Sequence, residues 1–237
     1  MTSTLQKTSN ISIIVPTLNE ADNLPILQPA AAVVKELIVV DGGSTDDTVK
    51  IAQDLGFRVI EKVAPGGRGA QLNTGAENAS APLILFLHAD TLLPSGFQDA
   101  VTKCLADPNT VLGAFSLKVD SGDTAISFIA MCANIRSRFL QIPYGDQSFF
   151  LQKDTFVKLG GFPELPIMED FIFVRQARKR GKIVTLPQTV TTSARRWQRL
   201  GPFRTTLINQ LVVLGYYLGI KPEKLAAFYR NKKSPNS

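Results

Sequence analysis

The stretch ELIVVDGGSTDDTVKIAQDLG, Glu36–Gly56, decides the fold class of this chain. It begins with a short β-branched run, Glu36–Val40, that is typical of a buried strand. Ser44 and Thr45 stand before two aspartates, which is the signature of a helix N-terminus, and Gly56 ends the helix. The stretch therefore predicts a strand, a glycine turn and a helix in direct succession.

Similar units surround this one in the first half of the chain. We expect strands at Ile11–Val15, Phe57–Glu61 and Leu83–His88, and helices at Ala21–Val34 and from a flexible loop, Gly66–Gly69, to about Asn78. Apolar strands that alternate with helices predict a parallel sheet covered on both faces, which is a Rossmann-like, doubly wound α/β fold. The loops after the strands form the ligand site in such folds.

The second half of the chain is less regular. We expect helices at Pro94–Leu105, Ile126–Leu140, Asp170–Arg180 and Leu200–Leu218, and strands at Val111–Val119, Gln147–Gln152 and Ile183–Leu186. No linker separates the halves, so we expect one domain over 1–237. Its parts are 11–110, 111–199 and a C-terminal helical segment, 200–230.

Charge and cysteine content limit the function classes. The 237 residues carry 26 Lys and Arg against 20 Asp and Glu, a net charge of +6 that favours nucleotide phosphates, nucleic acid or an anionic membrane as partners. Two distant cysteines, Cys104 and Cys132, exclude a disulfide framework and a zinc ribbon and indicate a cytoplasmic protein. The N-terminus shows no secretory signal, and the apolar stretch Leu207–Ile220 is too short to span a membrane.

Two glycine-rich segments follow predicted strands. Asp41 in VVDGGSTDDT stands at a strand end, where a carboxylate can bind a base or ribose or can simply hold the turn. Arg68 in GGRGAQLNTG is well placed for a diphosphate, which arginine binds bidentately, although a solvated loop charge is the alternative.

Three further segments carry candidate chemistry. LILFLHADT delivers His88 and Asp90 to a strand end, where one carboxylate can hold Mg²⁺ or Mn²⁺ together with substrate phosphates. PIMEDFIF holds Asp170 just before a helix, as a general base or only as a helix cap. SARRWQRLG surrounds Trp197 with arginines that could bind phosphates, an acceptor or nucleic acid, or it could be a solvated charge run with a buried tryptophan.

The order of these segments resembles the family 2 glycosyltransferases of the GT-A fold. PTLNE and DGGSTDDT each follow a strand, and GGRGAQLNTG, LFLHADT, GGF and ED come after them, so the similarity covers Ile11 to Trp197. The signature YGDQSFFL…GGFPELPIMED…TSARRW is similar to a small bacterial subgroup linked to arsenosugar-type gene clusters and to radical-SAM or seleno-domain partners.

The resemblance implies a role for each matching residue. It implies nucleotide-sugar contacts in the half 11–110 from Pro16, Thr17, Glu20, Asp41, Arg68, Ala89 and Asp90. Asp90 matches the final aspartate of the DXD motif and would hold the metal, and Asp170 matches the general base. The acceptor side, within 111–199, would be shaped by Asp146, Gln147, Glu169, Arg196 and Trp197.

The implied reaction is an inverting transfer of a sugar from a nucleotide-diphosphate sugar, with UDP favoured, to the hydroxyl of a small molecule, glycan or lipid. His88 stands where the family often has a first aspartate, so we expect Mn²⁺ or Mg²⁺ to arrive with the nucleotide. Ser193 replaces the glutamine of the QxxRW motif, so processive synthesis is not expected.

Several alternatives stay open at this point. A non-catalytic nucleotide-sugar sensor and a sugar nucleotidyltransferase are the rival functions. Nucleic-acid binding ranks last, because Asp41, Asp90 and Asp170 would repel a phosphate backbone. The helix Leu200–Leu218 has two interpretations: it packs against the catalytic lobe or a dimer partner, or it contacts the inner face of a membrane through apolar residues and flanking cations.

Overall fold

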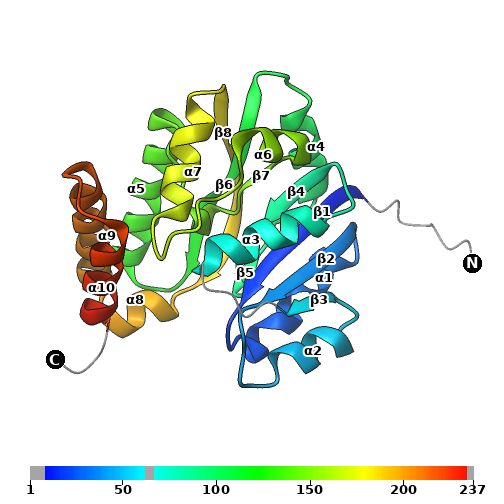
Figure 1. Ribbon diagram of the computed structural model, residues 1–237, viewed down its shortest axis with the longest axis horizontal. Helices are drawn as coiled ribbons and strands as arrows, with labels where there is room; N and C mark the ends of the chain where they lie inside the picture. Colours follow the sequence, from blue (N-terminus) through cyan, green and yellow to red (C-terminus); the bar gives the residue numbers. More distant parts are fainter. Residues whose placement is uncertain (1–8, 62–66, 234–237) are drawn as a thin grey trace, which may run out of the picture.

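An eight-stranded sheet with helices on both faces forms the centre of the molecule (Figure 1). The structure, a computed structural model, describes residues 9–61 and 67–233, without the side chains of 196, 199, 200 and 231–233. The sheet has the order β3-β2-β1-β4-β7-β6-β8-β5. The fold is therefore α/β, as the sequence predicts.

The first four strands form the predicted parallel half of the sheet. They are β1 (Ser9–Thr17), β2 (Val34–Asp41), β3 (Arg58–Glu61) and β4 (Leu83–Phe86). β2 and β4 both pair with β1 in parallel, and β3 pairs with β2. The carboxyl ends of these strands consequently lie at the same edge of the sheet.

The rest of the sheet is mixed. Its strands are β5 (Thr91–Leu92), β6 (Thr110–Asp120), β7 (Phe150–Gln152) and β8 (Lys182–Ser193). β7 is antiparallel to both β4 and β6, β8 is parallel to β6, and β5 is antiparallel to β8. The backbone N–H of Ser193 donates to the carbonyl of Asp90 at 3.2 Å, so β8 returns the chain to the strand-end edge.

Helices and 3₁₀ turns connect the strands. In the first half these are η1 (Ala21–Leu27), α1 (Gln28–Ala31), α2 (Thr48–Asp54), α3 (Gly67–Asn78) and α4 (Phe97–Leu105). In the second half they are α5 (Thr124–Leu140), η2 (Gly145–Gln147), α6 (Lys153–Leu159), α7 (Glu169–Arg178), α8 (Arg195–Leu200), α9 (Pro202–Tyr217) and α10 (Pro222–Lys233).

Two hydrophobic clusters lie on the two faces of the sheet. Alternate residues of β1 enter different clusters, Ile13 on one face and Ile14 on the other, and both are fully buried. Burying a side chain of this size stabilises the fold by about 1.5–3 kcal/mol. Helix α3 packs closely on β1 because Gly75 has no side chain, since a Cβ there would lie 2.3 Å from the Cγ2 of Ile14.

Several predicted boundaries are wrong. The predicted helix Ala21–Val34 is mostly the 3₁₀ turn η1, which contains Pro25, a residue with no amide hydrogen to donate. The predicted loop at Gly66–Gly69 lies partly outside the described residues at Gly66, and helix α3 begins at Gly67. Arg68 therefore belongs to the first turn of a helix.

Two corrections concern the C-terminal half. The predicted strand Ile183–Leu186 continues to Ser193, because β8 pairs with β6 along its whole length. Helices α6 and α8 were not expected, and the expected helical segment 200–230 is divided into α9 and α10. Within the described residues, every helix is too short or too polar to cross a bilayer.

Candidate active site

A cleft of about 420 Å³, the strand-end cleft, opens where β1, β2 and β4 end. The short loops that follow these three strands form much of its wall. Six of the residues predicted to contact a nucleotide-sugar line it: Pro16, Thr17, Glu20, Arg68, Ala89 and Asp90. The topology therefore brings together residues that are far apart in the sequence.

Asp41 holds the turn beside this cleft. Its carboxylate is buried and accepts hydrogen bonds from the backbone N–H groups of Gly43 at 2.9 Å and Ser44 at 2.8 Å, and from the hydroxyl of Thr17 at 3.1 Å. Gly42, the next residue, lines the cleft in its place. The structure thus shows the turn-holding role of Asp41, and its contact with a base stays a prediction.

Arg195 joins two acids at the cleft. Its Nη2 lies 3.0 Å from Oδ2 of Asp90 and 3.2 Å from Oε2 of Glu20. The hydrogen bond to Asp90, with help from Glu20, holds the pKa of the guanidinium above its ordinary value although partial burial opposes this. The side chain remains 53% exposed, so it is free to exchange these partners for others.

A second charged cluster lies around Arg68. Its Nε and Nη2 contact Oε1 of Glu169 at 2.7 and 2.6 Å, its Nη1 lies 3.1 Å from Nε2 of His88, and Oδ2 of Asp170 is 3.9 Å away. Burial lowers the pKa of the guanidinium, but the carboxylates of Glu169 and Asp170 outweigh it and raise that pKa. Arg68 is therefore a fixed cation.

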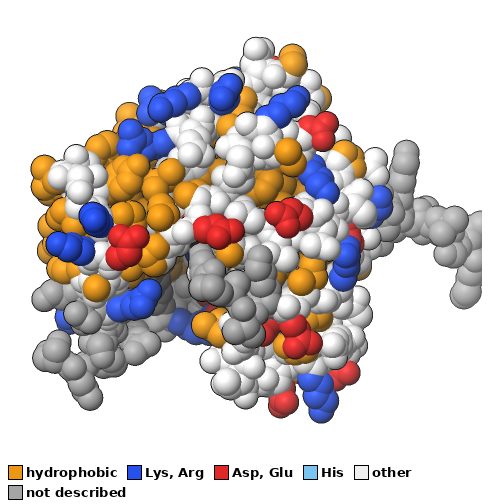
Figure 2. All heavy atoms as spheres, viewed as in Figure 1, with side chains coloured by type: hydrophobic (Ala, Val, Ile, Leu, Met, Phe, Trp, Pro, Cys, Tyr) orange, Lys and Arg blue, Asp and Glu red, His pale blue; other side chains and the backbone are white. Residues whose placement is uncertain are grey.

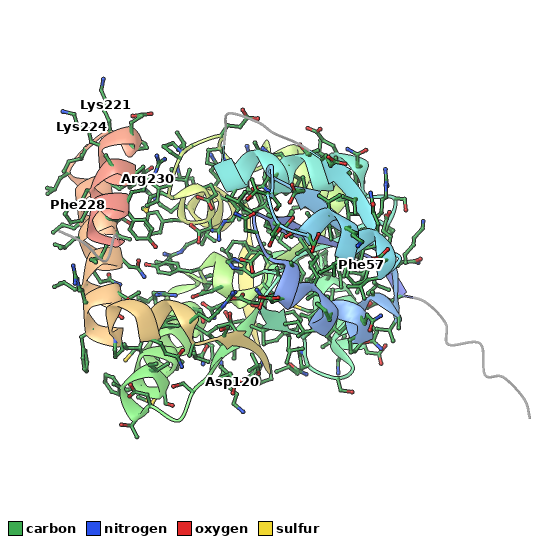
Figure 3. All side chains as sticks on the ribbon, turned by 90° about the horizontal axis from the view of Figure 1, so that it is seen from below. Phe57, Asp120, Lys221, Lys224, Phe228 and Arg230 are labelled. Atoms are coloured by element: carbon green, nitrogen blue, oxygen red, sulfur yellow. The ribbon has the colours of Figure 1, made fainter. Side chains whose placement is uncertain are left out.

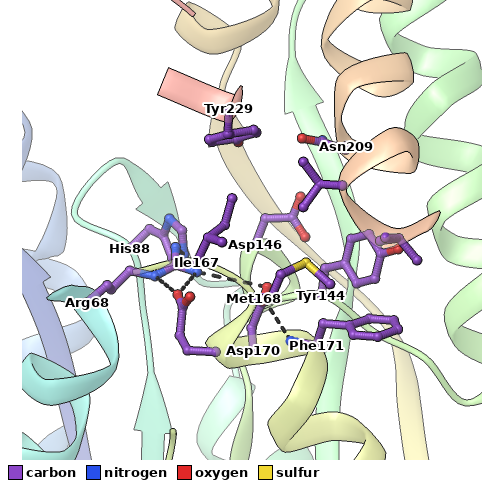
Figure 4. Close-up of a pocket in the computed structure, with 13 residues that line it drawn as sticks. Arg68, His88, Tyr144, Asp146, Ile167, Met168, Asp170, Phe171, Asn209 and Tyr229 are labelled. Atoms are coloured by element: carbon purple, nitrogen blue, oxygen red, sulfur yellow. Dashed lines mark hydrogen bonds and ion pairs between the residues drawn. The ribbon is translucent and has the colours of Figure 1, made fainter. Parts of the chain in front are cut away.

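A smaller inner pocket of about 120 Å³ lies on the other side of this cluster, and it shares Arg68 and His88 with the strand-end cleft (Figure 4). Asp146 and Asp170 also line the inner pocket. Helices α9 and α10 complete its wall, with Asn209 and Val212 from the first and Tyr229 from the second. Two cavities thus meet at one arginine and one histidine.

Asp170 is held in a fixed orientation in the inner pocket. Its Oδ1 accepts the backbone N–H of Phe171 at 2.7 Å, and its Oδ2 accepts that of Gly145 at 2.9 Å. A Cβ at Gly145 would be crowded, because it would lie 3.1 Å from Oδ2 of Asp170 and 3.3 Å from Nη2 of Arg68, and these side chains would have to move slightly. The preceding Met168 has φ of 72°, a left-handed conformation rare for methionine, which turns the chain into α7.

The remaining predicted acceptor residues divide between pocket and core. Asp146 and Glu169 line the inner pocket. Gln147 is fully buried and donates to the carbonyl of Phe115 and the hydroxyl of Ser137, both at 3.0 Å, so it anchors the loop. Trp197 packs in a core cluster, and the side chain of Arg196 lies outside the described residues.

Asp90 is the cleft residue best suited to a divalent cation. Among the described residues, no group of three or more His, Cys, Asp and Glu is arranged as a metal cage. A hard cation does not need one at a phosphate site, since it keeps waters and phosphate oxygens as ligands. One carboxylate at the cleft wall therefore fits an ion that arrives with a diphosphate.

Sequence reasoning missed several residues of the site. Arg195 was expected only as one of several arginines around Trp197, because the RW motif matches Arg196 and Trp197 and not Arg195. Asn209, Val212 and Tyr229 carry no motif and reach the inner pocket only through the packing of α9 and α10. Gln71 donates to the carbonyls of Thr17 and Val40, both at 2.9 Å, and so ties the ends of β1 and β2 together.

Part of this chain is similar in sequence to known proteins. The model of a family described as glycosyl transferase family 2 matches residues 12–160. An uncharacterized glycosyltransferase of Mycobacterium tuberculosis is 31% identical over 86 residues, 36% of this chain and 39% of the relative. A PGL/p-HBAD biosynthesis glycosyltransferase of Mycobacterium bovis is 41% identical over 91 residues, 35% and 36% of the two chains. The matched segment thus spans under two fifths of either relative.

Solved structures show the same fold over most of the chain. TarS of S. aureus, residues 1–349, superposes with a TM-score of 0.62 at 17% identity, covering 94% of this chain and 71% of that one. The mannosyltransferase PcManGT from Pyrobaculum calidifontis, in complex with GDP-Man and Mn²⁺, gives 0.63 at 19% identity, covering 95% and 74%. The architecture is that of GT-A fold glycosyltransferases.

Proposed function

The chain belongs to glycosyl transferase family 2, and we propose that it moves a sugar from a nucleotide-diphosphate sugar, preferably a UDP-sugar, to an acceptor hydroxyl with inversion. The observation that carries this proposal is the pair of cavities that share Arg68 and His88. The strand-end cleft suits the donor, and the inner pocket suits the acceptor. The reacting atoms would meet between them, so we also propose 11–110 as the donor half and 111–199 as the acceptor half.

The strand-end cleft offers polar groups and a half-exposed arginine, Arg195, to a donor. Thr17 and Gly42 stand at the ends of β1 and β2, where a base and ribose would lie. Arg195 is half exposed and can turn from its acids to a diphosphate, which arginine binds well. Asp90 would hold the divalent cation, which when bound offsets negative charge on the leaving diphosphate.

Asp170 is proposed as the general base. It would accept the proton of the acceptor hydroxyl while the acceptor oxygen attacks the anomeric carbon. The bond from that carbon to the diphosphate oxygen breaks, and its electron pair leaves with the diphosphate. The backbone N–H groups of Gly145 and Phe171 orient the carboxylate, and Arg68 fixes its surroundings.

Replacing Asp170 with Asn tests this role. We expect Asp170→Asn to lower turnover by ~10²–10⁴ with UDP affinity retained. Turnover is measured as the UDP released when the sugar of a UDP-sugar is transferred to water or to a screened hydroxyl acceptor. Glu164→Gln is the matched control, since Glu164 is exposed and does not line either pocket. Turnover equal to that of the unmodified enzyme in Asp170→Asn would remove this residue from the role.

Two narrower features remain proposals as well. The two free cysteines support a cytoplasmic location. The resemblance to the subgroup linked to arsenosugar-type gene clusters also stays a proposal, and it says little about the acceptor.

A further inference from the structure

Two neighbouring helices expose apolar stripes that no described element covers. On α9 the stripe is Phe203, Leu207, Leu211, Leu214 and Leu218, each 43–72% exposed. On α5 it is Phe128, Met131, Ile135 and Phe139, each 49–79% exposed. The spacing of three and four residues puts each stripe on one side of its helix, and α5 and α9 are in contact. The nine side chains of these two stripes are called the α5–α9 face.

This face differs from the ordinary scatter of surface hydrophobic residues. Single exposed apolar residues need no explanation, whereas a contiguous patch marks an interaction surface. Figure 2 shows the hydrophobic side chains gathered on the left of the molecule, where Figure 1 places α5, α9 and α10. The opposite side of α9 is already used, since Val212 packs with Phe171 and Leu225 in a small core.

The C-terminal segment of the sequence that contains α9 has an excess of positive charge. From Arg195 to the C-terminus the sequence has nine Lys and Arg and one acid, Glu223. The preceding 194 residues have 17 Lys and Arg and 19 Asp and Glu. Helices α5 and α9 contain no acidic residue. Lys221 and Lys224 are exposed where α9 turns into α10, and Figure 3 shows them at the end of this helix pair.

We propose that the α5–α9 face is a docking surface for an anionic lipid bilayer. An apolar stripe with flanking cations is the pattern that lies in the headgroup region, where apolar burial and attraction to anionic lipids add. A second copy fits less well, because a two-fold interface places the same cations of both copies near each other. The proposal does not depend on the proposed function.

The inner pocket lies behind this surface. Helix α9 presents Leu207, Leu211 and Leu214 outward and contributes Asn209 and Val212 to the inner pocket. One helix therefore joins the bilayer contact to the wall of the candidate acceptor site.

Cosedimentation with vesicles tests the docking. The unmodified protein should sediment with phosphatidylcholine vesicles that contain phosphatidylglycerol and remain in solution with pure phosphatidylcholine. Leu207→Glu with Leu214→Glu should lower the bound fraction at least about tenfold, because two charges enter the apolar contact. Val157→Glu is the control, since Val157 is 67% exposed on α6 and lies outside the face.

A charge reversal supplies a second variant that leaves the apolar face intact. Lys221→Glu with Lys224→Glu should weaken binding at least about tenfold, whereas the same reversals at Lys50 and Lys103, exposed on α2 and α4, should change it much less. Thermal unfolding of each variant checks that it is folded.

A label on the unmodified chain avoids mutation altogether. Cys132 is exposed on α5, whereas burial raises the pKa of the Cys104 thiol to about 11 and suppresses its reaction at neutral pH. A polarity-sensitive fluorophore on Cys132 should shift to the blue with anionic vesicles. No vesicle binding, binding that survives both double variants, or a dimer in light scattering that the Leu207 and Leu214 changes dissociate would overturn the proposal.

Discussion

Removing Arg195 should strengthen the binding of free Mn²⁺ to the nucleotide-free protein. The guanidinium contacts Oδ2 of Asp90 at 3.0 Å and competes with a metal ion for that oxygen. A half-exposed ion pair contributes about 0.2–1 kcal/mol, and 1.4 kcal/mol corresponds to tenfold in affinity. Arg195→Ala should therefore tighten Mn²⁺ binding by about 1.4- to fivefold, measured by titration of the Mn²⁺ electron paramagnetic resonance signal.

The controls separate a local effect from a change in net charge. Arg58→Ala removes a comparable half-exposed arginine, which pairs with Glu36 at 3.3 Å far from the cleft, and should leave Mn²⁺ affinity nearly unchanged. In an Asp90→Asn background the gain from Arg195→Ala should disappear. Unchanged or weaker Mn²⁺ binding in Arg195→Ala would show that the guanidinium does not compete with Mn²⁺ for Asp90. A gain in Mn²⁺ affinity that persists without Asp90 would show the same.

Two further predictions concern orientation and stability. Gly145→Ala should lower turnover with little change in UDP affinity, because a Cβ would lie 3.1 Å from Oδ2 of Asp170 and displace it. An equal loss of turnover and of UDP affinity would contradict this prediction. Burial raises the pKa of Glu36, but hydrogen bonds from Ser12 and Ser80 outweigh it and lower that pKa from 4.5 to about 2. The contribution of ionised Glu36 to the free energy of unfolding is therefore complete above pH 4.5 and is lost as pH falls toward 2. In urea unfolding, Glu36→Gln should cost about 1–2 kcal/mol at pH 7 after allowance for its partial exposure and almost nothing near pH 2, whereas the exposed control Glu77→Gln should cost little at either pH.

The parallel half of the fold was readable in the sequence because its central strands contain short apolar runs that a local pattern reveals. Ile11–Val15 and Glu36–Val40 lie within β1 and β2, and both faces of these strands are buried. The length of β8 was not readable, because most residues from Thr189 to Ser193 are polar and become strand by pairing with β6. Long-range pairing of this kind leaves no local periodicity.

The candidate site was predictable where motifs end strands and unpredictable where packing decides. Thr17, Ala89 and Asp90 follow strands and line the strand-end cleft as expected. Trp197 is packed in the core, as the alternative of a buried tryptophan predicts, and its acceptor role stays a prediction. Tyr229 reaches the inner pocket from α10, which lies in the predicted helical segment 200–230, but no motif marks it as a pocket residue.

Isothermal titration with UDP and GDP, each with and without Mn²⁺, examines the proposed donor site itself. We expect that one diphosphate, UDP, binds in a Mn²⁺-dependent manner and that Asp90→Ala removes the dependence. Absence of binding by either diphosphate, or UDP binding of equal affinity with and without Mn²⁺, would contradict a metal-assisted donor site at the ends of β1, β2 and β4.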